Sequence, residues 1–266
     1  MRVCEIHPPA EEKQATPKAA FGFPALLTSK PSAKQTGEHR RCGFARYIPP
    51  AEEKQATPKG TRQAEGEDVK LYFVRHGETD WNLESKIQGR NDIPLNATGI
   101  SQAEQLAMTL KMSEYDIKAI YSSRLKRALV TAEIVGKVLG IPPVVKDGLQ
   151  EMSLGSWEGF TWPQVRETFA DEYQCWYQNR RYQVPPGGES YQQLLDRLLP
   201  ALAQIMEETE GNALIVTHSA IIMTLMSYVY DTPFEDMAKN YKTGNTGIVE
   251  LEKEELYKKI VQENIS

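Results

Sequence analysis

Two short apolar runs, each followed by a histidine, constrain the fold of this chain more than any other feature. Residues 71–74 precede Arg75-His76-Gly77, and residues 213–216 precede Thr217-His218-Ser219. Short apolar runs that are rich in aromatic and β-branched residues are typical of buried strands. In a parallel sheet both strand ends would lie at one edge, where open α/β sheets bind ligands. The sequence therefore predicts that His76 and His218 share a crevice.

Strand-like and helix-like segments alternate through the rest of the region from residue 69 to the end. Alternation of this kind predicts a three-layer α/β/α sandwich with a mainly parallel mixed sheet. The expected strands are 71–74, 117–121, 144–145, 213–216 and 247–251. The first expected helix begins after Asn96 or Thr98. The later helices are expected at about 124–139, 163–179, 190–208 and 220–230. Residues 82–96 and 149–159 are expected to be loops, and the C-terminal stretch is expected to add an edge strand or to fray.

The first 68 residues differ from this pattern. They contain eight of the sixteen prolines and an identical 11-residue repeat, at 8–18 and again at 49–59. Two copies of a Pro-, Glu- and Lys-rich string cannot bury a core, so we expect 1–68 to be a disordered extension and 69–266 to be the catalytic domain. The repeat suits either a regulatory tail or translation of a repetitive element upstream of the true start.

The charge balance argues against two classes of partner. Residues 1–68 carry 11 Lys and Arg against 9 Asp and Glu, whereas 69–266 carry 20 against 27, so the net charges are +2 and −7. An acidic domain gives no electrostatic support for binding nucleic acid or an anionic membrane. A small anionic substrate would have to be attracted by a local cluster of cations. The oligomeric state is left open.

Three widely spaced cysteines, Cys4, Cys42 and Cys175, form neither a disulfide framework nor a zinc pattern. No apolar stretch approaches the roughly 18 residues of a membrane span. These features favour a cytoplasmic protein. There is no Asp-rich magnesium loop, Walker glycine loop or cluster of metal ligands, so we expect neither a metal nor a cofactor.

Several motifs, in order, resemble one family. Arg75-His76-Gly77-Glu78-Thr79, followed by Trp81-Asn82, resembles the signature of the histidine phosphatase superfamily, which is phosphoglycerate-mutase-like. Ser123 to Arg127-Ala128 resembles the family's Ser-x-x-x-Arg-Ala segment, and His218 matches its second histidine. The resemblance extends from about residue 71 to 251. It implies a metal-independent phosphomonoesterase that hydrolyses a small phosphorylated metabolite through a phosphohistidine.

The resemblance also assigns the catalytic roles. His76 is the expected nucleophile, and Arg75, Arg127 and His218 are expected to hold the transferred phosphoryl group. Neutral imidazole can attack phosphorus, and guanidinium groups offset the charge that grows on the phosphoryl oxygens. Glu151 matches the general acid, because the order Leu-x-Glu-x-x-x-Gly-x-Trp-Glu-Gly assigns that role to the first glutamate and not to Glu158.

Further side chains are expected around the substrate. Asn82, Gln88 and Gly89 belong to the expected phosphate pocket, and Ser219 stands where many relatives have glycine. Arg180 and Arg181 resemble the arginine pair that mutases of this family use for a substrate carboxylate, although two arginines at a helix end also suit a solvated surface. Glu189 and Ser190 are expected to shape a loop or to cap the following helix.

Two other functions fit parts of the sequence. A 2,3-bisphosphoglycerate-dependent phosphoglycerate mutase would share these residues, but mutases resemble Leu-Asn-Glu-Arg where this chain has Leu149-Gln150-Glu151-Met152. They also carry a longer insertion, whereas only 33 residues separate Glu151 from Pro185 here. A catalytically silent scaffold that binds phosphate is the third reading, and the intact set of catalytic residues argues against it.

Overall fold

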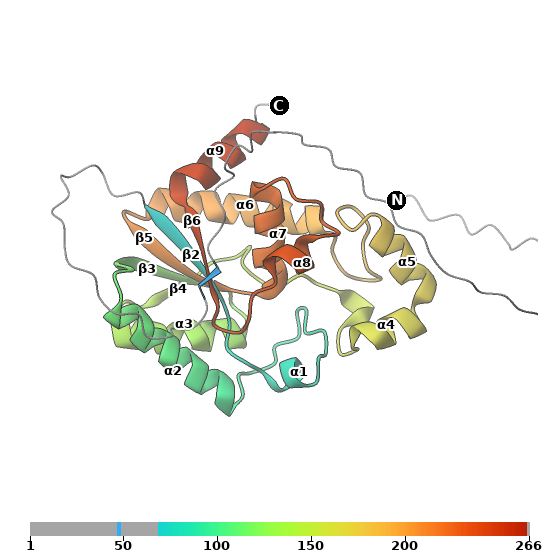
Figure 1. Ribbon diagram of the computed structural model, residues 1–266, viewed down its shortest axis with the longest axis horizontal. Helices are drawn as coiled ribbons and strands as arrows, with labels where there is room; N and C mark the ends of the chain where they lie inside the picture. The colour runs from blue at the N-terminus through green and yellow to red at the C-terminus, as the bar shows by residue number, and fades with distance from the viewer. Residues whose placement is uncertain (1–46, 49–68, 265–266) are drawn as a thin grey trace, which may run out of the picture. The chain divides into compact units, whose positions relative to one another are not determined.

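The computed structural model describes residues 47–48 and 69–264, and within them six strands form one mixed sheet (Figure 1). The order across the sheet is β1-β6-β2-β5-β3-β4. The strands are β1 (Tyr47–Ile48), β2 (Lys70–Arg75), β3 (Ile117–Ser122), β4 (Pro143–Val145), β5 (Asn212–Thr217) and β6 (Ile248–Glu252). Strands β2, β3, β4 and β5 run parallel, and β6 is antiparallel to β2. The predicted mainly parallel mixed sheet is confirmed.

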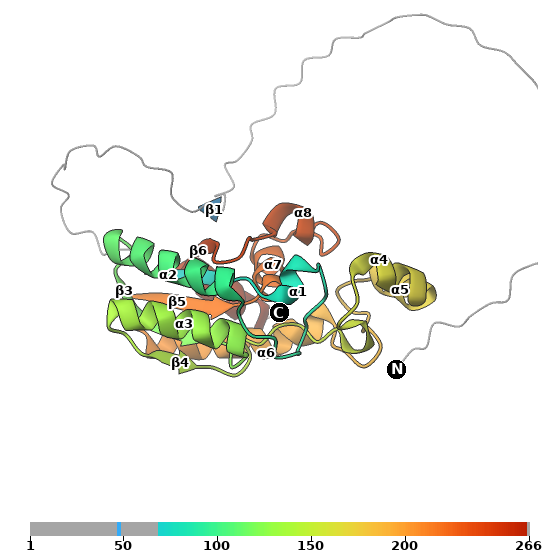
Figure 2. The ribbon, with the colours of Figure 1, turned by 90° about the horizontal axis from the view of Figure 1, so that it is seen from below.

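Helices cover both faces of the sheet, as Figures 1 and 2 show. In the described part of the chain the helices are α1 (Asp80–Leu83), α2 (Ala97–Met112), α3 (Lys126–Leu139), the 3-10 helix η1 (Gly155–Trp157), α4 (Trp162–Thr168), α5 (Ala170–Gln178), α6 (Tyr191–Glu208), α7 (Ser219–Val229), α8 (Met237–Tyr241) and α9 (Lys253–Asn264). Helices α2 and α3 pack on one face, and α6, α7 and α9 pack on the other. The fold is therefore the expected three-layer sandwich.

The side chains of β2 show why its apolar run is continuous. Leu71 and Phe73 belong to the core on the α6 and α7 side, whereas Tyr72 and Val74 belong to the core on the α2 and α3 side. Successive residues of a strand point to opposite faces, and both faces of this sheet are covered. The central strands therefore need apolar residues at every position.

Several predicted boundaries differ from the observed ones. The segment 163–179 forms two helices, because Phe169 has a non-helical backbone and packs edge-on against Phe160. Helix α1, whose N-terminus Thr79 and Asn82 cap with a capping box, overlaps the first two residues of the loop expected at 82–96. The C-terminal stretch forms α9 and is not an edge strand. Buried Leu256 and Ile260 recur four residues apart, as in a helix that packs one side on a core.

The predicted start of α2 is confirmed. Asn96 caps α2, because its side chain accepts a hydrogen bond from Gly99 N at 2.8 Å. Ala103, Leu106 and Leu110 point into the core, whereas Ile100 is 41% exposed and lies outside it. Helix α6 continues through Pro200, which lies exposed on the solvent side.

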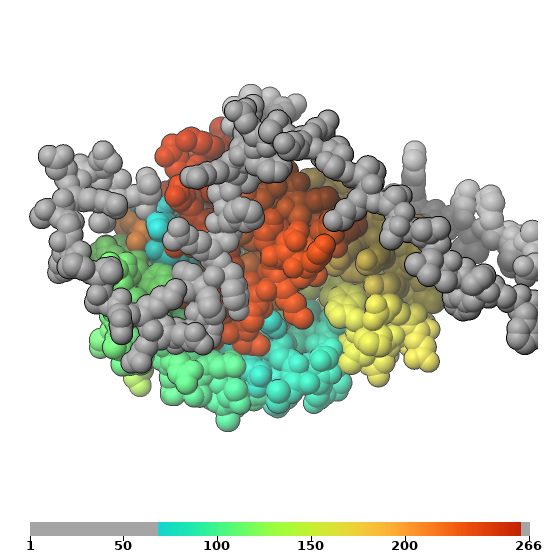
Figure 3. Space-filling model, in the orientation of Figure 1, coloured from blue at the N-terminus to red at the C-terminus, as the bar shows by residue number. Residues whose placement is uncertain are grey.

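Helices α4 and α5 lie beyond the sheet, past the carboxyl ends of its strands (Figure 1). In the space-filling view their yellow surface lies beside the cyan segment that contains α1 (Figure 3). A β-bridge between Lys86 and Thr161 joins the two segments. Three tryptophans, from η1, α4 and α5, pack together: the Trp157 and Trp176 rings meet edge-on at 5.4 Å, and Trp162 stacks on Trp176 at 5.5 Å. This aromatic cluster fixes an outer wall near the strand ends.

Strand β1 lies within the segment 1–68 and pairs antiparallel with β6, Tyr47 with Val249 and Ile48 with Ile248. Both copies of the 11-residue repeat lie outside the described residues. The expectation that 1–68 is disordered falls largely on these residues. Among the residues that the structure describes, no helix is both long and apolar enough to cross a membrane.

Candidate active site

The strand ends bring the two histidines together. Arg75 pairs with Thr217 across β2 and β5, so His76 and His218 follow at neighbouring positions of one sheet edge. Their rings lie 5.3 Å apart between centroids. Both side chains are buried, with exposed fractions of 2% and 0%. The shared crevice that the sequence predicts is therefore present.

The hydrogen bonds of His76 set its tautomer. Its Nδ1 lies 2.7 Å from the carbonyl oxygen of Gly77, which can only accept, so Nδ1 carries the proton and Nε2 has a free lone pair. Burial lowers the pKa of His76 well below its ordinary value, and the charges of Arg127 and Arg75 lower it further. The imidazole is therefore neutral near pH 7, as a nucleophile requires.

Side chains remote in the sequence hold the main chain around His76. Thr131, on α3, accepts a hydrogen bond from Gly77 N at 3.1 Å, and Asn245 donates to the carbonyl of His76 at 3.0 Å. A Cβ atom on Gly77 would collide with the carbonyl of Gly99 on α2. Close packing against α2 therefore requires glycine at this position. The sequence analysis did not identify Thr131 or Asn245.

Within the described residues, Arg75 and Arg127 donate hydrogen bonds to main-chain carbonyls and to no carboxylate. Arg127 is fully buried and donates to the carbonyls of Asn91 and Gly89 at 2.7 and 2.8 Å. Arg75 donates to the carbonyl of Thr243 at 2.8 Å. Burial lowers the pKa of Arg127 to about 10, so the guanidinium remains charged at neutral pH. The Nε atoms of Arg75 and Arg127 are buried without a hydrogen-bond partner among the described residues.

His218 is the N-terminal cap residue of α7, and its ring lies deep beside His76. Its Nε2 shares a hydrogen bond with Ser123 Oγ at 2.8 Å, while Nδ1 is buried without a partner among the described residues. Burial, followed by the charge of Arg127, lowers the pKa of His218 well below its ordinary value. One nitrogen of a neutral ring is thus left to bond a ligand.

The structure separates the two candidate glutamates. The carboxylate of Glu151 accepts from Met152 N at 2.9 Å and from Ala220 N at 3.4 Å. Burial raises the pKa of Glu151, although the charge of Arg127 opposes the shift. Glu158 instead accepts from four loop groups, namely the main-chain N–H groups of Arg90 and Leu154, the amide of Asn91 and the hydroxyl of Ser153. Glu158 holds loops together, whereas Glu151 faces the pocket.

A pocket of about 240 Å³ opens in front of these groups. Its lining includes nine of the eleven predicted site residues: Arg75, His76, Asn82, Gln88, Gly89, Arg127, Glu151, Arg180 and Ser219. His218 lies behind the lining, and Arg181 lies elsewhere. Trp162, Met223 and Tyr191 also line the pocket and were not identified from the sequence.

The amide side chains lie at the pocket wall. Asn82 uses its Oδ1 to accept from Thr79 N at 3.1 Å and from Asn245 at 3.3 Å, which fixes its orientation. Gln88 is buried, and its Oε1 has no hydrogen-bond partner among the described residues. Ser219 is the first residue of α7, so the N-terminus of that helix faces the pocket.

Arg180 and Arg181 point in different directions. Arg180 lines the pocket, lies over the Trp176 ring at 4.6 Å and donates to Tyr191 Oη at 3.3 Å. Arg181 lies over the ring of Phe234 at 5.3 Å and donates to Gln192 at 2.8 Å, and it lines a separate depression. Arg181 therefore lies outside the pocket that Arg180 lines, because the chain leaves α5 at Gln178 and turns between them.

No group of three or more His, Cys, Asp or Glu side chains in the described part of the chain is arranged to hold a metal ion. The chemistry available at the site consists of a neutral imidazole, a fully buried and a partly buried guanidinium group, a second imidazole and a carboxyl with a raised pKa. Such a set suits the transfer of a dianionic group through a covalent intermediate.

Known proteins are similar to this chain in sequence and in fold. The sequence pattern of the histidine phosphatase superfamily (branch 1) matches residues 71–266. A metal-independent phosphoserine phosphatase of Arabidopsis thaliana is 36% identical over 166 residues, which cover 61% of this chain and 69% of that protein. The phosphoglycerate mutase-like protein 4 of the same plant is 38% identical over 167 residues, which cover 60% of this chain and 72% of that protein.

A solved structure shows the same architecture. It is a mycobacterial glucosyl-3-phosphoglycerate phosphatase in complex with VO3, which superposes with a TM-score of 0.62 at 28% sequence identity. The superposition covers 69% of this chain and 92% of the mycobacterial one.

Proposed function

Because the chain belongs to branch 1 of the histidine phosphatase superfamily, we propose that it is a metal-independent phosphomonoesterase acting on a small phosphorylated metabolite through a phosphohistidine. One observation carries the proposal. His76 has an unprotonated Nε2, and Arg75, Arg127 and Glu151, the last with a raised pKa, line the same pocket as His76.

In the first half-reaction Nε2 of His76 attacks the phosphorus atom. An N–P bond forms while the bond from phosphorus to the ester oxygen breaks. Arg75, Arg127 and His218 hold the phosphoryl oxygens, with the amide of Asn82 as a further donor, and offset their growing charge. Glu151 gives its proton to the leaving oxygen, which departs as an alcohol.

The second half-reaction returns the enzyme to its starting state. Water attacks the phosphohistidine, the N–P bond breaks, and Glu151, now ionised, accepts the proton that the water loses. Inorganic phosphate then leaves. The Nδ1–H bond to the Gly77 carbonyl keeps the imidazole in the same tautomer throughout.

Arg180 indicates the substrate class. Its guanidinium lies in the same pocket, oriented by the Trp176 ring and by Tyr191, and its Nε has no hydrogen-bond partner among the described residues. Phosphoserine and glucosyl-3-phosphoglycerate, which the similar phosphatases are named for, both carry a carboxylate near the phosphate. We therefore propose a phosphate ester with a second anionic group.

The experiment is a panel of phosphorylated metabolites assayed for release of inorganic phosphate. The protein should hydrolyse phosphorylated carboxylic acids best. Arg180→Ala should raise KM roughly 10- to 150-fold for these compounds, as expected for the loss of a charge-assisted contact, and leave neutral-tailed esters unchanged. Arg181→Ala is the matched control, because its side chain lies outside the pocket. Equal effects of the two substitutions would contradict the proposed role of Arg180.

A phosphoglycerate mutase is the second candidate, favoured by the similarity to a phosphoglycerate mutase-like protein. A mutase returns the phosphoryl group to the substrate, whereas a phosphatase transfers it to water. Phosphorus NMR with a phosphoglycerate separates the two, because a mutase interconverts phosphate positions without net release of phosphate.

The domain boundary and the compartment are also proposals. We place the catalytic domain at 69–266, which the family match at 71–266 supports, and we assign residues 1–68 to an extension, of which β1 pairs with β6 of the domain. The low cysteine content supports a cytoplasmic location.

A further inference from the structure

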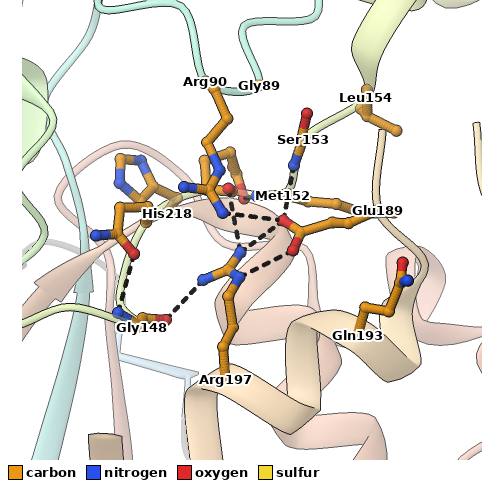
Figure 4. Close-up of polar contacts among 12 residues, drawn as sticks. Gly89, Arg90, Gly148, Met152, Ser153, Leu154, Glu189, Gln193, Arg197 and His218 are labelled. Atoms are coloured by element: carbon orange, nitrogen blue, oxygen red, sulfur yellow. Dashed lines mark hydrogen bonds and ion pairs between the residues drawn. The ribbon is translucent and has the colours of Figure 1, made fainter. Parts of the chain in front are cut away.

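A single ion pair contacts the main chain around Glu151. Glu189 follows the Pro185-Pro186-Gly187-Gly188 turn, and Arg197 projects from α6 (Figure 4). The pair is bidentate, with Arg197 Nε at 2.9 Å from Oε2 and Nη2 at 2.7 Å from Oε1 of Glu189. The exposed fractions of the two side chains are 14% for Glu189 and 21% for Arg197, so the pair is largely shielded from water.

The remaining polar groups of this pair bond to the loop that carries Glu151. Arg197 donates to the carbonyl of Gly148 at 2.7 Å and to the carbonyl of Glu151 itself at 3.2 Å. Glu189 accepts from Ser153 N at 2.8 Å. The pair therefore holds the loop before, at and after the proposed general acid.

Gly148 shows how closely this loop approaches α6. Its φ of +92° lies in a region that favours glycine, and a Cβ atom there would come within 2.5 Å of the Arg197 carbonyl. The close approach brings the loop within hydrogen-bond distance of a side chain on α6. Gly148 and Arg197 together thus fix the position of this loop against α6.

The pair does not bond to the carboxylate of Glu151, which accepts from Met152 N and Ala220 N. Its influence on Glu151 must pass through the main chain. Burial alone would raise the pKa of Glu189, but the hydrogen bond and charge of Arg197, together with the Ser153 N–H and the charge of Arg90, outweigh burial and lower it. Glu189 therefore stays ionised at neutral pH, and the pair remains intact.

We propose that Glu189 and Arg197 are positioning residues that hold the Glu151 carboxyl at the leaving-group oxygen, an inference that rests on the proposed function. A general acid must lie within hydrogen-bond reach of the oxygen that it protonates, and a small displacement lowers the rate greatly. Arg90 also contacts Glu189, at 3.3 Å, but its side chain is 38% exposed and contributes less.

The test uses the dependence of general-acid catalysis on the leaving group. A primary alkyl phosphate needs a proton on its leaving oxygen, whereas an aryl phosphate with a strongly acidic phenol does not. The ratio of the two kcat/KM values is measured for wild type, Glu189→Gln and Arg197→Lys. Lysine keeps the charge, but it cannot form the bidentate contact to Glu189 and also bond both loop carbonyls. Because both rates come from one preparation, the ratio does not depend on the fraction that is folded.

Two further variants calibrate the result. Glu151→Gln removes the acid itself and sets the largest expected change. Glu208 lies on α6, as Arg197 does, and forms an ion pair with Lys146. Glu208→Gln removes this ion pair and should leave the ratio unchanged. We expect both positioning variants to lower the alkyl-to-aryl ratio at least tenfold.

Parallel losses on both substrates, or no loss on either, would overturn the inference. If Glu151→Gln lowers the ratio but Glu189→Gln and Arg197→Lys do not, the proposed function stands and only the positioning role fails. If Glu151→Gln leaves the ratio unchanged, Glu151 is not the acid, and both the proposed mechanism and the positioning role are refuted.

Discussion

Replacing Arg127 with methionine should remove phosphate binding while changing the stability of the free protein only modestly. The side chain is fully buried, and no carboxylate forms a salt bridge with it in the described part of the chain. Its hydrogen bonds go to the carbonyls of Gly89 and Asn91. The substitution therefore removes a buried charge together with two hydrogen bonds, and these effects oppose each other.

Two magnitudes set the stability change. The pKa of Arg127 falls from 12.5 to about 10, which corresponds to about 3 kcal/mol against the charged form in the folded protein. Methionine removes this cost but leaves two carbonyl oxygens without a donor, at about 1–3 kcal/mol each. The free energy of unfolding should therefore fall by at most about 3 kcal/mol.

The loss of catalytic rate and of phosphate binding should be larger than this loss of stability. Removing one preorganised donor to a developing charge typically costs about 10²–10³ in rate. Phosphate at 100 times its Kd should raise the free energy of unfolding of the wild type by about 2.7 kcal/mol, and this gain should disappear in Arg127→Met.

The assay is urea unfolding, followed by tryptophan fluorescence, with and without inorganic phosphate. Arg124→Met is the matched control, because that arginine lies three residues earlier and its side chain is 59% exposed. The control should keep the full gain from phosphate. A phosphate gain retained in Arg127→Met, or a loss of about 5 kcal/mol in the absence of phosphate, would show that this guanidinium is structural.

Two further predictions concern pH. Burial raises the pKa of Glu151, so kcat/KM for an alkyl phosphate should fall as pH rises through that pKa. The Glu151→Gln variant should lose this fall at high pH. If the fall persists in the variant, another group is responsible for it. Burial lowers the pKa of His76 and of His218, so the unfolded chain binds more protons than the folded one below about pH 6.5. The free energy of unfolding should fall below that pH by up to about 1.4 kcal/mol per pH unit for each histidine, and His218→Gln should show a shallower slope in urea titrations between pH 7 and 5.

Much of the site was predictable because its parts lie at the ends of regular elements. His76 and His218 follow short apolar strands, and parallel pairing alone brings such ends together. Arg127 is the second residue of α3, so the predicted helix was sufficient to locate its side chain. Local sequence was sufficient wherever a residue's position depends on its own strand or helix.

The supporting residues were not predictable, because their partners are remote. Thr131 lies 54 residues from Gly77, Asn245 lies 169 from His76, and Arg197 lies 46 from the Glu151 carbonyl. A single sequence carries no signal for such pairs. Glu189 was expected to shape a loop, which it does, but its partner on α6 was not identified. Arg180 and Arg181 were treated alike because a turn after α5, not a helix, decides where each points.

The most direct test of the account is a rapid-quench experiment with a ³²P-labelled substrate. The account predicts a phosphoryl adduct that is labile in acid and stable in base, that forms and decays at rates consistent with turnover, and that mass spectrometry assigns to His76. His76→Ala should form no adduct and should lose several orders of magnitude in rate. Turnover near the wild-type rate in His76→Ala, or an adduct on another residue, would contradict the mechanism.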